Sequence, residues 1–262
     1  MTFVDGRRHS HVEVVMGTVV SFDVRTADEA RDAVADACAW LHRVDATFST
    51  YRTTSEISRL NRGELRLADA SDDVRAVIAR CAELREQTRG AFDAQIAGTL
   101  DPSGYVKGWA AERAAHILER HGLRDFQINA GGDIVVRGDA HPGTGWRIGI
   151  RHPDRADALV GVVCLHDGAI ATSGAYERGA HVLTAAGGVS ARRFRSVTVT
   201  GRDLGTADAW ATAILAWGDD GFDLLAHAPP DIEAFAVLDD TTVQTPGFPE
   251  AAGRTFARAP DG

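Results

Sequence analysis

Apolar side chains recur with helical spacing in four parts of the chain, and each part predicts an amphipathic helix. In the second part, five apolar residues fall on one face, and Ser71 stands where an N-cap residue is expected, followed by acidic residues in the first turn. The predicted helices cover about residues 28–46, 71–88, 108–119 and 206–217.

Runs of β-branched and apolar residues, bounded by Gly, Pro and Asp, predict short strands. Residues 12–24 contain Gly17 near their middle and predict either a strand pair or one bent strand. Early helices followed by mostly short strands favour an α+β or mixed α/β fold. Because we find no internal repeat and no low-complexity linker, we expect one domain over residues 1–262, with a core from about residue 12 to 240 and a frayed C-terminal tail. The other predicted strands are 126–129, 133–137, 146–151, 158–165, 196–200 and 233–239.

The charge balance argues against a nucleic-acid partner. The 37 acidic residues outnumber the 28 basic ones, the formal net charge is −9, and no Lys/Arg-rich block occurs. Lys107 is the single lysine of the chain, so any basic patch has to be built from arginine. An isolated lysine of this kind is a candidate for a specific role.

The cysteines and the N-terminus suggest an intracellular protein. Cys38, Cys81 and Cys164 are widely spaced and form no CxxC pair, which predicts neither a disulfide framework nor a zinc site. Cys38 and Cys81 fall on apolar helix faces and are expected to be buried free thiols. The first fifteen residues lack an apolar stretch of signal-peptide length, and no later segment is long enough to span a membrane, so we expect a cytoplasmic protein.

The segment FQINAGGDIVVRG places Gly131, Gly132 and Asp133 between two predicted strands. Two glycines let the backbone approach a bulky group, and their N–H groups can face an anion. The same residues also suit a tight turn between strands. The pattern is not GxGxxG and opens no helix, so a dinucleotide-binding fold of the Rossmann type is disfavoured.

Loops and a helix end supply further polar candidates. Asp93 follows an aromatic residue in a Gly-flanked loop, and Asp101 and Lys107 flank an expected Gly turn before a helix. Carboxylates in loops suit ligand hydroxyl or ring N–H groups, and a lysine suits a phosphate, although turn formation alone accounts for the carboxylates. Tyr51 offers a stacking surface, and a helix capped near Thr54 or Ser55 is expected after it.

Asp208 and Thr212 stand four residues apart in the apolar stretch ADAWATAIL. Four residues is about one helical turn, so both side chains share one face of the predicted helix. One interpretation is helix capping or a solvent-facing edge. The other is that a carboxylate and a hydroxyl together hold a hard cation.

Several short motifs follow one another along the chain: MGT, FSTY with SEISRLN, GAFD, DPSGYVKG, INAGGDI, WRIGI, ATSGAY, HVL, and SVTV with ADAWATA. In this combination and order the sequence resembles the ApbE family of FAD:protein FMN transferases, from about Met16 to Trp217. The resemblance implies that family's own α/β fold, related to T-fold modules. It also implies a magnesium-dependent, flavin-handling activity.

The resemblance assigns roles to particular residues. His181 would activate the acceptor hydroxyl, and Asp208 and Thr212 would bind Mg²⁺ through side-chain oxygens. Backbone oxygens of Gly104 and Ala211 would complete the protein ligands. The residues that would contact FAD are Met16, Tyr51, Ala91, Phe92, Asp93, Asp101, Lys107 and Val182.

The implied reaction cuts the pyrophosphate of FAD, transfers FMN to a Ser or Thr hydroxyl of an acceptor protein and releases AMP. An incomplete all-oxygen ligand set suits Mg²⁺, whose remaining positions go to water and substrate phosphate. The cation would neutralise charge that grows on the phosphoryl oxygens. FAD and an acceptor protein are therefore the expected partners.

The chain departs from the family pattern after the histidine. The family continues there with Asp, Pro and Arg, whereas this chain continues His181-Val182-Leu183-Thr184-Ala185, and the segment between Tyr176 and His181 is short. An acceptor protein would be expected to dock at this loop. Two alternatives to the transferase therefore stay open: an FAD pyrophosphatase that gives FMN and AMP, and a non-catalytic FAD-binding module.

Overall fold

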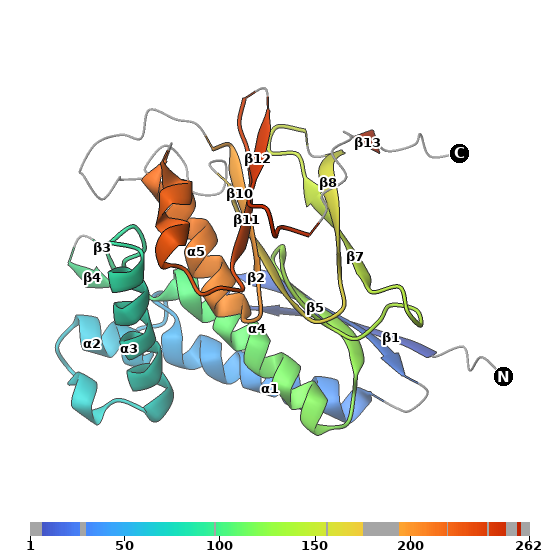
Figure 1. The fold of residues 1–262 in the computed structure, drawn as a ribbon. Helices are drawn as coiled ribbons and strands as arrows, with labels where there is room; N and C mark the ends of the chain where they lie inside the picture. The colour runs from blue at the N-terminus through green and yellow to red at the C-terminus, as the bar shows by residue number, and fades with distance from the viewer. Residues whose placement is uncertain are drawn as a thin grey trace.

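An antiparallel sheet of eight strands forms the centre of the protein, with the strand order β1-β2-β5-β6-β9-β10-β11-β12 (Figure 1). The computed structural model describes residues 7–26, 30–96, 98–155, 157–174, 194–218, 220–239, 241–249 and 256–257. Each neighbouring pair in this sheet is antiparallel. The strands are β1 (Arg7–Val15), β2 (Thr18–Thr26), β5 (Asp125–Ala130), β6 (Asp133–Arg137), β9 (Gly168–Gly174), β10 (Ser196–Gly201), β11 (Glu233–Val237) and β12 (Thr242–Gln244).

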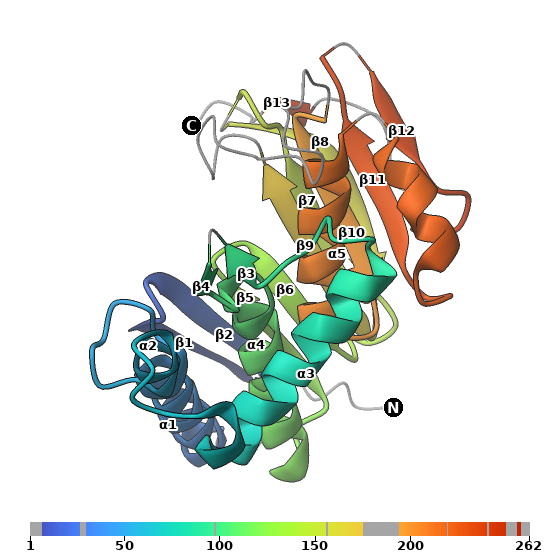
Figure 2. The same ribbon diagram turned by 90° about the vertical axis from the view of Figure 1, so that its left-hand side faces the viewer.

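Helices cover one face of this sheet. Figures 1 and 2 show α1 (Arg31–Phe48), α4 (Ser103–Arg120) and α5 (Leu204–Trp217) against that face, with α3 (Asp72–Gln87) outside α4. Their apolar stripes and the inward residues of the sheet form the main hydrophobic core. Smaller elements complete this side: α2 (Glu56–Asn61), the 3₁₀ turns η1 (Leu67–Asp69) and η2 (Gly221–His227), and the short pair β3 (Gln95–Ile96) and β4 (Thr99–Leu100).

A second, smaller sheet lies on the other face. It has the order β13-β8-β7 and comprises β7 (Trp146–Arg151), β8 (Ala158–Leu165) and β13 (Phe256–Ala257). A separate apolar cluster fills the space between the two sheets, and it includes Trp146, Val163 and Phe235. The large sheet is therefore buried on both faces over its middle strands, which explains why β6 and β10 are almost continuously apolar or buried.

The elements agree with most of the predictions from the sequence. Residues 133–137, 146–151 and 158–165 form strands with the expected bounds, and residues 12–24 belong to a strand pair rather than one bent strand. Ser71 and Ser55 are both N-caps whose side chains accept backbone N–H groups. Both Cys38 and Cys81 are buried free thiols, as expected, and burial raises the pKa of the Cys81 thiol to about 12.

The expected Gly turn between Asp101 and Lys107 is wrong, because helix α4 begins at Ser103 and includes Gly104 and Lys107. Pro102 is the N-cap residue of this helix, and Oδ1 of Asp101, just before it, accepts the backbone N–H of Ser103 at 3.0 Å. Among the described residues, no helix is long and apolar enough to cross a membrane.

Helices α4 and α5 cross with their backbones in contact. A Cβ added to Gly108 of α4 would lie 2.6 Å from the carbonyl oxygen of Leu204, and one added to Gly205 of α5 would lie 2.8 Å from the ring of Tyr105. Only glycine permits this approach, although glycine is a poor helix former. The crossing places Lys107, next to Gly108, beside α5.

Gly108→Ala is expected to lower the free energy of unfolding by about 1–3 kcal/mol, the usual cost of overpacking, because the new methyl group meets backbone that cannot rotate away. Thermal or urea unfolding followed by circular dichroism measures this change. Better helix propensity alone would instead stabilise the variant by up to about 1 kcal/mol. A rise in stability would thus show that the two helices are not in contact at this position.

Candidate active site

A buried ion cluster lies where α4, α5 and β6 meet. The Nζ of Lys107 lies 2.5 Å from Oδ2 of Asp133 and 3.7 Å from Oδ2 of Asp208. Only 2% of the surface of Asp133 and 5% of that of Asp208 is exposed. Two buried carboxylates therefore lie beside one ammonium group. Buried charge of this kind favours a further cation.

The position of Asp133 follows from a glycine turn. Gly131 and Gly132 join β5 to β6 with φ values of +65° and +107°, which only glycine adopts without strain. Asp133 then begins β6, and its Oδ1 accepts the backbone N–H of Thr172 on β9 at 3.0 Å. This hydrogen bond aims Oδ2 at Lys107. The tight-turn interpretation of GGD is thus confirmed, and the turn also places a carboxylate in the cluster.

Asp208 and Thr212 lie on the buried side of α5. Both are buried, and the hydroxyl of Thr212 lies 3.2 Å from that of Ser173 on β9. Neither residue caps the helix, because Asp203 does so by accepting the N–H of Thr206 at 2.7 Å. The interpretation of the pair as a cap or a solvent-facing edge is therefore wrong. One turn of α5 presents a carboxylate and a hydroxyl to the same interior region.

A cavity of about 330 Å³ opens beside Lys107. Met16 and Gly17, in the turn between β1 and β2, contribute one wall, and Tyr51 stands at the mouth with 96% of its surface exposed. Met16 has a φ of +54°, a left-handed conformation that costs a residue other than glycine about 1–2 kcal/mol. Such strain is concentrated at functional sites. The full lining is Met16, Gly17, Val44, Asp45, Phe48, Ser49, Thr50, Tyr51, Arg52, Ser103, Val106 and Lys107.

Comparison with known proteins agrees with this arrangement. The sequence model described as the ApbE family matches residues 16–101 and 97–236. The chain belongs to the ApbE family.

Curated relatives of the chain carry the name FAD:protein FMN transferase. One from Klebsiella pneumoniae is 31% identical over 129 residues, which cover 45% of this chain and 37% of that protein. One from Rhodobacter capsulatus is 33% identical over 153 residues, which cover 55% of this chain and 29% of that protein. The chain thus spans well under half the length of these two relatives.

Solved ApbE structures share the fold. The ApbE protein of Thermotoga maritima superimposes with a TM-score of 0.80 at 22% identity, covering 92% of this chain and 97% of its own. The flavin transferase ApbE of Vibrio cholerae superimposes with a TM-score of 0.78, also at 22% identity and over the same shares. These likenesses, together with helices packed on an antiparallel sheet, confirm the expected α+β fold of the ApbE type.

The structure brings together some of the residues that ApbE membership suggests. Met16, Tyr51 and Lys107 line one cavity, and Lys107 also joins it to Asp208. Gly104 lies in the first turn of α4, and Ala211 lies next to Thr212 on α5. A helix carbonyl keeps a second lone pair for another partner, so both backbone oxygens remain possible ligands.

Other suggested residues are engaged elsewhere among the described residues. Phe92 is buried in the main core. Asp93 accepts the Nε–H of Arg85 and the backbone N–H of Gln95, each at 2.8 Å, and so holds its own loop. Neither Ala91 nor Asp101 belongs to the cavity lining. His181 and Val182 lie outside the described residues.

The sequence alone does not assign Asp133 to the candidate site. Its GGD context is typical of a turn, and its partner Lys107 lies far earlier in the chain. The one available signal was that the only lysine of the chain must find an acidic partner if it is buried. The sequence does not show which of the 37 acidic residues that partner is.

Proposed function

We propose that this protein transfers FMN from FAD to a Ser or Thr hydroxyl of an acceptor protein and releases AMP, with Mg²⁺ bound at Asp208 and Thr212. The observation that supports this most directly is the position of Lys107. It lies beside two buried carboxylates and lines an open cavity at the same time. A phosphate group at this junction would meet the ammonium group, while a flavin lies in the cavity.

The residues present fit Mg²⁺. Asp208 and Thr212 offer a carboxylate and a hydroxyl one helical turn apart, and the carbonyls of Gly104 and Ala211 would add neutral oxygens. Asp133 is a second buried carboxylate beside Lys107, and buried carboxylates favour cationic partners. Mg²⁺ prefers oxygen ligands and keeps positions for water and phosphate. When bound, it would stabilise negative charge on the phosphoryl oxygens.

The residues of the chain then have separate tasks. Lys107 donates hydrogen bonds to phosphate oxygens, and Asp133 holds Lys107 in place. His181 takes the proton of the acceptor hydroxyl. The hydroxyl oxygen forms a bond to the phosphorus on the FMN side of the pyrophosphate. The bond from that phosphorus to the bridging oxygen breaks, and AMP leaves with its electron pair.

Tyr51→Ala is expected to weaken FAD binding by about 1–3 kcal/mol, the usual value of one aromatic stacking partner. Because the Tyr51 side chain is almost fully exposed, its removal should leave the melting temperature unchanged. Isothermal titration calorimetry with FAD measures the effect. Leu67→Ala, which removes an exposed apolar side chain outside the cavity lining, is the matched control. Equal FAD affinity of the Tyr51 variant and the wild type would exclude this cavity as the flavin site.

The proposed function is tested by incubating the protein with FAD, Mg²⁺ and candidate acceptor proteins, followed by intact-mass measurement. An acceptor that gains the mass of FMN supports the transferase. Release of FMN and AMP without an acceptor would instead support the pyrophosphatase, in which water replaces the acceptor hydroxyl. Tight FAD binding without turnover would leave a binding module. The cytoplasmic location and the single-domain organisation stay predictions.

A further inference from the structure

Strand β1 has its polar and apolar faces reversed. Its inward residues His11 and Glu13 are paired in register with Phe22 and Val20, whose side chains are fully buried. Its outward residues Val12 and Val14 are 62% and 72% exposed. An edge strand that packs on a helix ordinarily turns its apolar residues inward. The inward polar residues of β1 therefore call for an explanation other than core packing.

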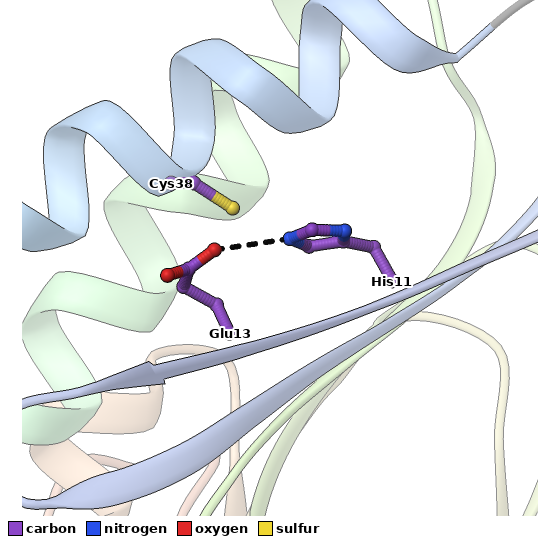
Figure 3. A group of neighbouring side chains, drawn as sticks. All are labelled: His11, Glu13 and Cys38. Atoms are coloured by element: carbon purple, nitrogen blue, oxygen red, sulfur yellow. Dashed lines mark hydrogen bonds and ion pairs between the residues drawn. The ribbon is translucent and has the colours of Figure 1, made fainter.

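Helix α1 completes a cluster opposite these residues. Cys38 and His42 are one helical turn apart and so face the same way. The Nε2 of His11 lies 3.1 Å from Oε2 of Glu13, and the Nε2 of His42 lies 3.0 Å from Oε1 of the same carboxylate. Figure 3 shows the thiol of Cys38 above the pair formed by His11 and Glu13.

The spacing of these atoms suits a metal ion. One ligand atom each from His11, Glu13 and Cys38 lies within 4.8 Å of the others, and His42 contacts this group through Glu13. In a tetrahedral site with Zn–S near 2.3 Å and Zn–N near 2.0–2.1 Å, neighbouring ligand atoms are roughly 3.3–3.8 Å apart. Small rotations of the partly exposed His11 and Glu13 side chains would bring the ligand atoms to the separations of a zinc site. The wide spacing of cysteines in the sequence gave no indication of such a site, because only one of them takes part.

The charges in the cluster are compatible with this arrangement. Hydrogen bonds from His11 and His42 lower the pKa of Glu13, so the carboxylate is ionised. Burial, with the nearby charge of Glu13, raises the pKa of the Cys38 thiol to about 11. The thiol is thus neutral in the ion-free protein, and a bound zinc ion would displace its proton.

We propose that His11, Glu13, Cys38 and His42 form a Zn²⁺ site between β1 and α1. Thiolate and imidazole ligands favour zinc over Mg²⁺, which prefers oxygen. The site is separate from the oxygen cluster around Asp208 and does not depend on the proposed function. Its role is structural: β1 leads into the turn of Met16, and α1 supplies Val44 and Phe48 to the cavity. An ion here would link the strand that leads into one wall of the cavity to the helix that contributes to another wall.

The full chain, stripped of metal with a chelator, is titrated with Zn²⁺ by calorimetry in buffer that contains excess Mg²⁺. We expect one equivalent of zinc per chain and a rise in melting temperature on binding. Co²⁺ as a probe should give the visible bands of a tetrahedral site and a thiolate charge-transfer band. Binding of much less than one equivalent would overturn the proposal.

Two variants locate the site. Cys38→Ser and His42→Gln should each weaken zinc binding by more than roughly 100-fold, since loss of an outer hydrogen-bond partner alone costs 10–100-fold. His42 is about half exposed, so its variant is expected to fold even if that of the buried Cys38 is not. Cys164→Ser, which removes the exposed thiol, is the matched control and should bind zinc as the wild type does. Unchanged binding in His42→Gln, or loss of binding in Cys164→Ser, would place the zinc elsewhere and overturn the proposal.

Discussion

Asp208→Asn is expected to abolish Mg²⁺-dependent transfer of FMN while the protein stays folded. The substitution keeps the shape of the side chain but removes one of the two buried negative charges beside Lys107. The amide oxygen that replaces the carboxylate carries no charge and is a poorer ligand for a divalent cation. Because the cation contributes several kcal/mol to stabilising the transition state, we expect a loss of at least roughly 10³-fold in rate.

Single-turnover rates measured over a range of Mg²⁺ concentrations test this expectation. FAD affinity should survive in part, because Met16 and Tyr51 lie on the cavity wall and are unaltered. The Mg²⁺-induced rise in melting temperature should disappear in the variant. Asp72→Asn, at a fully exposed carboxylate on α3, controls for the general effect of charge removal. A variant at Asp208 that keeps the Mg²⁺ dependence of the wild type would place the metal elsewhere.

His181→Ala is expected to lower the rate of transfer to an acceptor by roughly 10²–10⁴-fold, the usual range for loss of a general base. FAD affinity should change little, because the proton comes from the acceptor hydroxyl and not from the flavin. Here the support is the resemblance to the ApbE family, since His181 lies outside the described residues. Added imidazole should restore part of the lost rate.

A packing role for His181 would produce a different pattern. The melting temperature would fall, and the rate per folded molecule would match that of the wild type. Both quantities should therefore be measured on one preparation. If transfer is lost but hydrolysis of FAD continues, the histidine acts on the acceptor alone, and water reaches the phosphorus without it.

Patterns in the sequence predicted helices and strands well where these depend on residues that are close together in the chain. The strand at 133–137 and the caps at Ser55 and Ser71 follow from residues that are neighbours in the chain. The start of α4 could not be predicted in this way. Gly108 weakens helical propensity, and its presence is explained by the crossing with α5, which lies about a hundred residues later.

In the candidate site, too, the sequence predicts features that depend on neighbouring residues and does not predict contacts between distant ones. The spacing of Asp208 and Thr212 was enough to place both on one helix face, and the structure buries that face. Asp93 illustrates the opposite case, because a carboxylate in a Gly-flanked loop suits a ligand and a loop-holding ion pair equally well. Its contact with Arg85 could be recognised only once α3 and the loop were placed side by side.

The pairing of β2 with β5 has a consequence for how the chain folds during synthesis. Val20 lies opposite Ala130, while β1 and β2 are joined by a two-residue turn. The first hairpin can thus form as soon as it leaves the ribosome, but its partner strand is made only after α1 to α4. Closing so long a loop is slow, and until then β2 presents an unpaired edge. The nascent protein therefore passes through a stage in which its N-terminal strands are open to association with other chains.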